Sequence, residues 1–135
     1  MLDTEGYCAE GSGENLFIVR DGRIKTAPLT CVLPGITRDT VMRLALESGI
    51  PIEEQRFTRD ELYIADEAFF TGTAAEVTPI REVDGRAIGK GEPGPVTKSL
   101  QEKFFAVVQG RDAKRSSWLD VYDPGSVKKP AKAKV

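Results

Sequence analysis

Residues 10–17 of this chain place a carboxylate, Glu10, between an expected strand and two glycines. A carboxylate in such a place can pair with a protonated ring nitrogen of a bound heteroaromatic group. The pair keeps the ring cationic, and a cationic ring withdraws electrons from a bound substrate. The alternative is a solvated carboxylate at a turn, because most glutamates in proteins are exposed. The segment by itself leaves both interpretations open.

Residues 33–39 and 70–80 offer donors for an anion such as a phosphate. Pro34-Gly35 precedes a helix expected to begin at Thr37, and the free N–H groups and positive dipole end of a first turn favour a phosphate. Gly35 would let the main chain come close to it. In the Gly-Thr-Ala-Ala turn of residues 72–75, small side chains leave successive N–H groups accessible, and Thr73 adds a hydroxyl. The alternatives are a helix start capped by Thr37 and an ordinary turn.

Two glycine-rich stretches resemble nucleotide-binding motifs but lack required positions. Gly11 and Gly13 are followed by Leu16 where a dinucleotide fingerprint needs its third glycine, and the segment leads into an expected strand and not a helix. Residues 85–90 are one position short of a P-loop, and Gly91 stands where a Ser or Thr would hold magnesium. We therefore interpret neither stretch as a nucleotide site.

Composition excludes several kinds of chemistry. The chain has 135 residues, enough for one domain with one core, and no histidine, which excludes His-based catalysis and His-ligated metals. Cys8 and Cys31 form no Cys-x-x-Cys pair, so we expect no metal site and free thiols in a reducing, cytoplasmic compartment. No apolar run is long enough to span a membrane. The net charge is −2 although residues 125–135 carry four lysines, so the body is acidic and nucleic acid is not an expected partner.

Turn signals and apolar periodicity predict the first half of the fold. Residues 2–26 should form a β meander, with a tight hairpin at Asp21-Gly22 and a strand buried on both faces at residues 16–19. A helix is expected from about Thr37 to Ser48, where Gly49 and Pro51 end it. A strand should follow over residues 52–57.

The second half mixes short helices and strands. The Thr-x-x-Glu pattern of residues 58–61 predicts a capping box and a short helix to about Ala65. Next come a strand over 68–71 and a hairpin of residues 76–83 with 86–88. Pro95 suits the first position of a helix, whose apolar stripe would be Leu100, Phe104, Val107 and Val108. Trp118 and Tyr122 should fold back as an apolar patch. Because strands and helices do not alternate regularly, we expect an α+β fold.

Several fixed positions resemble the fold-type IV pyridoxal-phosphate aminotransferases, most closely the branched-chain amino acid transaminases. The family pattern has a Glu, an Asn followed by an apolar and an aromatic residue, an apolar-x-Thr step, and an apolar-x-Gly-apolar-x-Arg/Lys step. The matching residues, all in register, are Glu10, Asn15-Leu16-Phe17, Ile24-Lys25-Thr26 and residues 33–38. The resemblance runs from Met1 to about Tyr122. Residues 33–39 and 72–80 look less like D-amino acid transaminases or aminodeoxychorismate lyases.

The resemblance implies a fold and an activity. Residues 1–123 would be the C-terminal large domain of the D-amino acid aminotransferase-like fold, a mixed β-sheet or pseudo-barrel with flanking helices, followed by a disordered Lys-rich tail at 124–135. With pyridoxal 5'-phosphate, the full-length enzyme would transfer an amino group between leucine, isoleucine or valine and 2-oxoglutarate, as a homo-oligomer with no nucleic acid or membrane partner. The alternatives are the two related enzymes of the same fold and a catalytically inactive fragment.

The resemblance also implies roles for individual residues. Glu10 would pair with the pyridine nitrogen, and Leu33 would pack against the cofactor ring. The full set of cofactor contacts would be Glu10, Leu33, Gly35, Ile36, Thr37 and Thr73, and the substrate carboxylate would contact Thr73, Ala74 and Ala75. Asn15 and Glu14 would either support the contact residues from behind or be structural, and no metal is expected.

The Schiff-base lysine of the family has no counterpart among the lysines of this chain. In the family this lysine precedes the segment that matches Met1. We therefore expect the chain to be the C-terminal domain of a longer enzyme, with the lysine upstream of Met1 and no catalytic residue within the chain. Alone, it is expected to be inactive.

Overall fold

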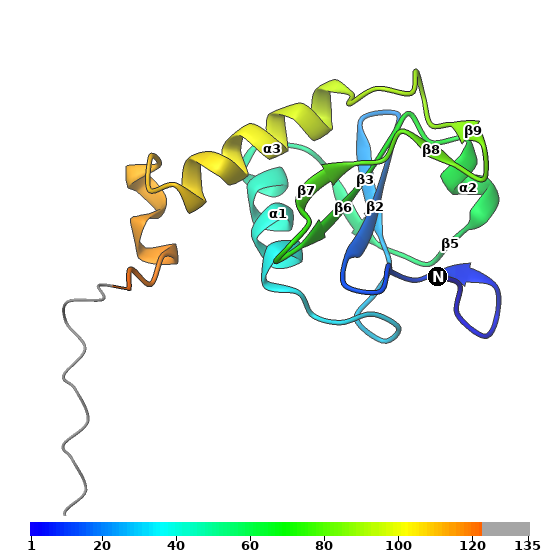
Figure 1. The fold of residues 1–135 in the computed structure, drawn as a ribbon, viewed down its shortest axis with the longest axis horizontal. Coiled ribbons are helices and arrows are strands. Elements are labelled where there is room, and N and C mark those ends of the chain that lie inside the picture. The colour runs from blue at the N-terminus through cyan, green and yellow to red at the C-terminus, as the bar shows by residue number, and fades with distance from the viewer. Residues whose placement is uncertain (123–135) are drawn as a thin grey trace, which may run out of the picture. The chain divides into compact units, whose positions relative to one another are not determined.

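The computed structural model describes residues 1–122, which fall into two compact units that divide between Phe105 and Ala106. The first unit combines short strands with helices, which confirms the predicted α+β class (Figure 1). The tail predicted to be disordered, residues 124–135, lies outside the described residues.

The centre of the first unit is a five-stranded sheet with the order β4-β3-β2-β6-β7. Its strands are β2 (Asn15–Arg20), β3 (Arg23–Thr26), β4 (Ile52–Glu54), β6 (Glu67–Gly72) and β7 (Glu76–Pro79). The β3–β4 pair is parallel and the other pairs are antiparallel. The β2–β3 turn has positive φ at both Asp21 and Gly22, as the Asp-Gly signal predicted.

Strand β2 is buried on both faces, which explains its continuous apolar run. On one face Phe17 stacks on Phe69 of β6, with ring centroids 5.0 Å apart. Helix α1 (Ile36–Glu47) packs against β6. On the other face Leu16 and Ile18 belong to an apolar cluster with Phe57, Leu62, Ala68 and Ile88. Because side chains alternate along a strand, the two faces of β2 serve two separate parts of the core.

Two smaller sheets and one short helix complete this unit. Strand β1 (Tyr7–Cys8) pairs with β5 (Phe57–Thr58), and β8 (Glu82–Val83) pairs with β9 (Arg86–Ala87) around Asp84-Gly85. Helix α2 (Arg59–Tyr63) has both hydrogen bonds of the predicted capping box between Thr58 and Glu61.

Three strand predictions differ from the structure in their bounds or in part of their pairing. The single strand expected over residues 52–57 is split, because β4 pairs in the large sheet while β5 pairs with β1. The meander expected over residues 2–26 is incomplete, because β1 pairs with β5 in a separate two-stranded sheet and not with β2. The strand expected over residues 76–83 is divided after Pro79. Its first part, β7, pairs with β6, whereas its second part, β8, forms the predicted hairpin with β9.

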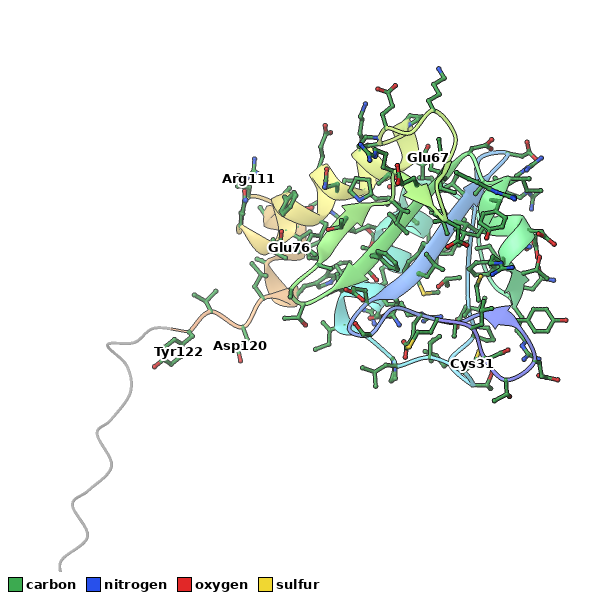
Figure 2. The ribbon with its side chains drawn as sticks, turned by 45° about the vertical axis from the view of Figure 1, so that its right-hand side comes forward. Cys31, Glu67, Glu76, Arg111, Asp120 and Tyr122 are labelled. Atoms are coloured by element: carbon green, nitrogen blue, oxygen red, sulfur yellow. The ribbon has the colours of Figure 1, made fainter. Side chains whose placement is uncertain are left out.

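Helix α3 (Pro95–Val108) begins at Pro95, as predicted. Its first turn is bound by the Glu67 carboxylate, which accepts from Val96 N at 3.0 Å and Thr97 N at 2.7 Å (Figure 2). The predicted apolar stripe is narrower than expected. Val108 is 44% exposed, whereas the other three members of the stripe are buried.

The second unit contains a 3-10 helix, η1 (Ala113–Trp118). The Arg115 guanidinium lies 5.6 Å from the centre of the Trp118 ring. The apolar patch predicted for Trp118 and Tyr122 does not form, because Tyr122 is 71% exposed (Figure 2). Among residues 1–122, each helix is too short or too polar to cross a bilayer, and no group of three or more potential metal ligands is found.

Candidate functional site

The three segments singled out in the sequence meet at one cavity of about 120 Å³. It lies where the start of β2, the start of α1 and the β6–β7 turn come together (Figure 1). The sheet brings the segments into contact, because β2 and β6 pair with Asn15 opposite Thr71. The lining consists of residues 10–15, 33, 35–37 and 71–73.

The N-terminus of α1 forms one wall of this cavity. Gly35 is its N-cap residue, with an extended backbone and no side-chain hydrogen bond to the helix. Thr37 is the second helical residue, so the alternative in which Thr37 caps the helix is wrong. The first N–H groups of a helix have no acceptor within the helix. Ile36 and Thr37 carry two of these groups and both line the cavity. The wall is therefore suited to an anion.

The Glu10 carboxylate is fixed by hydrogen bonds to the protein and is not a freely solvated group. Its Oε2 accepts from Leu33 N at 2.9 Å and from Asn15 Nδ2 at 3.1 Å. The same Asn15 nitrogen donates to the Leu33 carbonyl at 2.9 Å. Asn15 is buried and thus joins Glu10 to the segment that leads into α1, which agrees with the structural role expected for it. The predicted role of Glu14 stays open, although its carboxylate accepts from Gly13 N at 3.1 Å.

Two glycines of the cavity are required by close packing within the protein. A Cβ atom at Gly35 would overlap Oδ1 of Asn15, and one at Gly72 would lie 2.7 Å from the Gly13 carbonyl oxygen. Sequence reasoning explained Gly35 by the approach of a ligand. The structure adds the approach of Asn15 as a second reason for a glycine at this position.

The predicted substrate-binding residues occupy the turn between β6 and β7. Thr73 lines the cavity and is exposed. Ala74 and Ala75 follow it in the turn but do not line the cavity as it stands. Glu76 adopts a positive φ of 52° and closes the turn, and the Ala75 carbonyl accepts from the Thr78 hydroxyl at 2.6 Å. The structure thus brings Thr73 to the other predicted residues and leaves the two alanines outside the cavity.

Sequence reasoning missed Thr71. This residue of β6 lines the cavity and is 0% exposed, and its hydroxyl has no hydrogen-bond partner among the described residues. The sequence does contain a signal for it: Thr71 is two residues from Phe69, so strand alternation places both side chains on the same buried face. A polar residue at a position expected to be apolar indicates a hydrogen bond to another part of the protein or to a ligand. The uncapped helix start suits a phosphate, and the fixed Glu10 carboxylate suits a protonated ring nitrogen. The cavity therefore fits a phosphorylated, heteroaromatic ligand.

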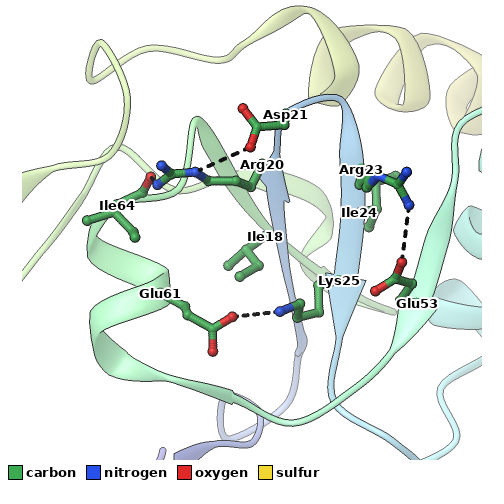
Figure 3. A pocket seen from close by; sticks show the side chains of 9 residues that line it. All are labelled: Ile18, Arg20, Asp21, Arg23, Ile24, Lys25, Glu53, Glu61 and Ile64. Atoms are coloured by element: carbon green, nitrogen blue, oxygen red, sulfur yellow. Dashed lines mark hydrogen bonds and ion pairs between the residues drawn. The ribbon is translucent and has the colours of Figure 1, made fainter.

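A larger hollow of about 450 Å³ lies beside the β2–β3 hairpin and α2 (Figure 3). Its charged side chains pair with one another: Lys25 with Glu61 at 2.6 Å, Arg23 with Glu53 at 3.4 Å, and Arg20 with Asp21 at 3.8 Å. The hydrogen bond from Lys25 lowers the pKa of Glu61. Since these charges already have partners, the smaller cavity at α1 is the better candidate site.

Known proteins resemble this chain over most of its length. The model of the amino-transferase class IV family matches residues 1–83. The branched-chain-amino-acid aminotransferase of Pseudomonas aeruginosa is 62% identical over 118 residues, which are 87% of this chain and 38% of that protein. The Escherichia coli enzyme of the same name is 52% identical over 120 residues, 88% of this chain and 39% of that protein.

Two solved structures show the same fold. The branched-chain aminotransferase of Thermobaculum terrenum in its PLP form has a TM-score of 0.86 and 45% identity. That of Thermoproteus uzoniensis with norvaline has a TM-score of 0.85 and 51% identity. Each comparison covers 89% of this chain and 40% of the other. The chain thus spans about two fifths of the length of the relatives it matches. Because the family model matches residues 1–83, more than half of the chain, the chain belongs to the class IV aminotransferases.

Proposed function

We propose that this chain forms the phosphate- and ring-binding part of a branched-chain aminotransferase that depends on pyridoxal 5'-phosphate. The reaction would transfer an amino group between leucine, isoleucine or valine and 2-oxoglutarate. The observation that carries this proposal is a single cavity that holds both the Glu10 carboxylate and the uncapped N-terminus of α1. The relative in its PLP form supports the choice of cofactor.

Each end of the cavity suits one part of the cofactor. Glu10 is oriented by Leu33 N and Asn15, so its charge can keep a protonated ring nitrogen in place. Leu33, 69% exposed at the rim, would pack against the ring. The N–H groups of Ile36 and Thr37 and the hydroxyls of Thr37 and Thr73 would bind the phosphate. When bound, the cofactor supplies an electron sink for the substrate carbon.

The substrate would lie at the rim, beside the β6–β7 turn. We propose that Thr73, Ala74 and Ala75 receive its carboxylate through their backbone N–H groups. Thr73 already lines the cavity, and Ala74 is exposed next to it. Small side chains at this turn leave the main chain accessible to a ligand. An amino acid and a 2-oxo acid each carry such a carboxylate, so the two substrates could bind to the same donors in turn.

Catalysis would need a lysine that this cavity lacks. No lysine of residues 1–122 lines the cavity. We propose that the lysine used by the family comes from outside these 135 residues, and that the complete enzyme is a homo-oligomer. The side chains of Leu33 and Ile36 are 69% and 87% exposed, which favours their coverage by cofactor or by further protein.

Calorimetric titration of the 135-residue chain tests the proposed cofactor site. Pyridoxamine 5'-phosphate needs no lysine and should bind at least about tenfold more tightly than pyridoxamine, because the phosphate meets several oriented donors. Replacing Thr37 and Thr73 together by Val should weaken phosphate-dependent binding by about 2–4 kcal/mol. Thr40→Val is the matched control, since the Thr40 hydroxyl donates to the Ile36 carbonyl and Thr40 does not line the cavity. Equal affinity for the two ligands would refute the proposal.

The proposed need for an external lysine has its own test. The purified chain should show no turnover of leucine with 2-oxoglutarate beyond that of the free cofactor. Turnover above this background would show that residues within the chain suffice for the chemical step.

A further inference from the structure

Within residues 1–122, the Thr71 hydroxyl is a buried donor without an acceptor. Thr71 lies in β6 between Asn15 of β2 and Val77 of β7, and none of its surface is exposed. Its Oγ1 atom has no hydrogen-bond partner among the described residues, and the residue lines the cavity at the start of α1. Buried polar groups in proteins are usually paired, so this hydroxyl requires an explanation.

Packing does not require a hydroxyl at this position. Valine has nearly the same shape as threonine, is β-branched and favours strands, and it would bring no unpaired polar atom into the core. The same sheet shows what a structural threonine does. The buried Thr26 hydroxyl donates to the Leu16 carbonyl at 2.8 Å. Thr71 makes no such bond among the described residues, so its hydroxyl lacks an acceptor that a ligand in the cavity would have to supply.

The position of Thr71 indicates which part of a ligand it meets. Strand alternation places it on the same face as Phe69, in a strand that α1 contacts. Gly35, Ile36 and Thr37 of the α1 N-terminus line the same cavity. The N–H groups of that helix start can only donate, so a ligand there must be an acceptor. A phosphate can accept a further hydrogen bond, because each of its oxygens accepts more than one.

We propose that Thr71 is a phosphate-binding residue, which donates its hydroxyl hydrogen bond to the same anion as the start of α1, Thr37 and Thr73. The inference rests on the proposed function, because it takes the phosphate of the cofactor as the anion. It adds to that site a fully buried donor from the sheet. Such a donor is held by the strand before the ligand arrives.

Three variants of the 135-residue chain test this inference by calorimetric titration with pyridoxamine 5'-phosphate and with pyridoxamine. Thr71→Val should weaken binding of the phosphorylated ligand about tenfold, as expected for one hydrogen bond to a charged group, and leave pyridoxamine binding unchanged. Thr71→Ser keeps the hydroxyl and should stay within about threefold of the original affinity. Thr71→Ala also removes the hydroxyl and must reproduce the selective loss, so the test stands even where Thr71→Val folds poorly.

Thr97 offers a matched control. Its hydroxyl is also buried and without a partner among the described residues, but Thr97 lies in α3 and outside the cavity. Thr97→Val should leave both affinities unchanged. Thermal unfolding without ligand gives a second readout. Thr26→Val should lower Tm because a hydrogen bond is lost, whereas Thr71→Val should not, because the Thr71 hydroxyl has no partner among residues 1–122 to lose.

The outcomes separate this inference from the function on which it rests. If the original chain prefers the phosphorylated ligand and Thr71→Val keeps that preference, only the role of Thr71 is refuted. The same holds if Thr71→Val weakens both ligands equally, or if Thr71→Ser binds as weakly as Thr71→Val. If the original chain does not prefer the phosphorylated ligand, the phosphate site and the role of Thr71 are both refuted.

Discussion

The side-chain nitrogen of Asn15 lies 3.1 Å from the Glu10 oxygen Oε2 and donates a hydrogen bond to it. Because the same nitrogen also donates to the Leu33 carbonyl, one buried amide joins the start of β2 to the segment before α1. Those two places carry the groups proposed for the ring nitrogen and the phosphate. Their separation is therefore set by a contact inside the protein, before any ligand binds.

Replacing Asn15 by alanine should destabilise the chain by about 2–3 kcal/mol, because two hydrogen bonds are lost and the Glu10 carboxylate loses one of its donors. Urea unfolding followed by circular dichroism measures the change. Ser12→Ala, at an exposed position that also lines the cavity, is the control and should stay within about 0.5 kcal/mol of the original chain. A similarly small effect of Asn15→Ala would mean that the amide does not hold the site together.

Gly35→Ala should destabilise the chain by about 1–3 kcal/mol, because the added Cβ would overlap Oδ1 of Asn15. Backbone strain is not the cause, since φ at Gly35 is −70°, which any residue adopts. A double-mutant cycle with Asn15→Ala separates the two explanations. In the Asn15→Ala background the cost of Gly35→Ala should largely disappear. An equal cost in both backgrounds would show that glycine is required here by the backbone conformation or by a neighbour other than Asn15.

Glu67→Gln should destabilise α3 by about 1–2 kcal/mol, because the carboxylate accepts from the N–H groups of both Val96 and Thr97 and lies at the positive end of the helix dipole. Amide hydrogen exchange should show faster exchange at the start of α3 than in the original chain. Glu102→Gln changes an exposed residue of the same helix and is the matched control. Unchanged protection at Val96 and Thr97 would contradict the capping role of Glu67.

Stability should fall as the pH is lowered through the acidic range. The hydrogen bond from Lys25 lowers the pKa of Glu61 in the folded chain, and the hydrogen bond from Arg56 lowers that of Asp3. A lowered pKa means that folding favours the ionised form. Its contribution is therefore present above the pKa of the unfolded chain and is lost as the pH falls through the folded one. Tm measured from pH 7 to pH 3 should decrease, and less steeply in Glu61→Gln. An identical slope in that variant would show that Glu61 does not contribute to the loss of stability at low pH.

Local signals predicted much of the secondary structure because their physics is local. The Asp-Gly pairs predicted the two tight turns, which need positive φ at adjacent residues. The Thr58–Glu61 pattern predicted a capping box, and Pro95 predicted the start of α3. The bounds of α1 differ from the prediction by one residue at each end.

The amino-acid sequence by itself thus determined the α+β class, the family and the three segments of the site, since these depend on neighbouring residues and on their spacing. Only the tertiary structure decided that residues 52–57 divide between two sheets, that Asn15 holds Glu10 beside α1, and that Ala74 and Ala75 stay outside the cavity. It also decided that the Thr71 hydroxyl is buried and has no partner in the part of the chain that the structure describes. The physical reason is that strand pairing, burial and the partners of a buried polar group depend on residues far apart in the chain, whose contacts exist only once the sheet has formed.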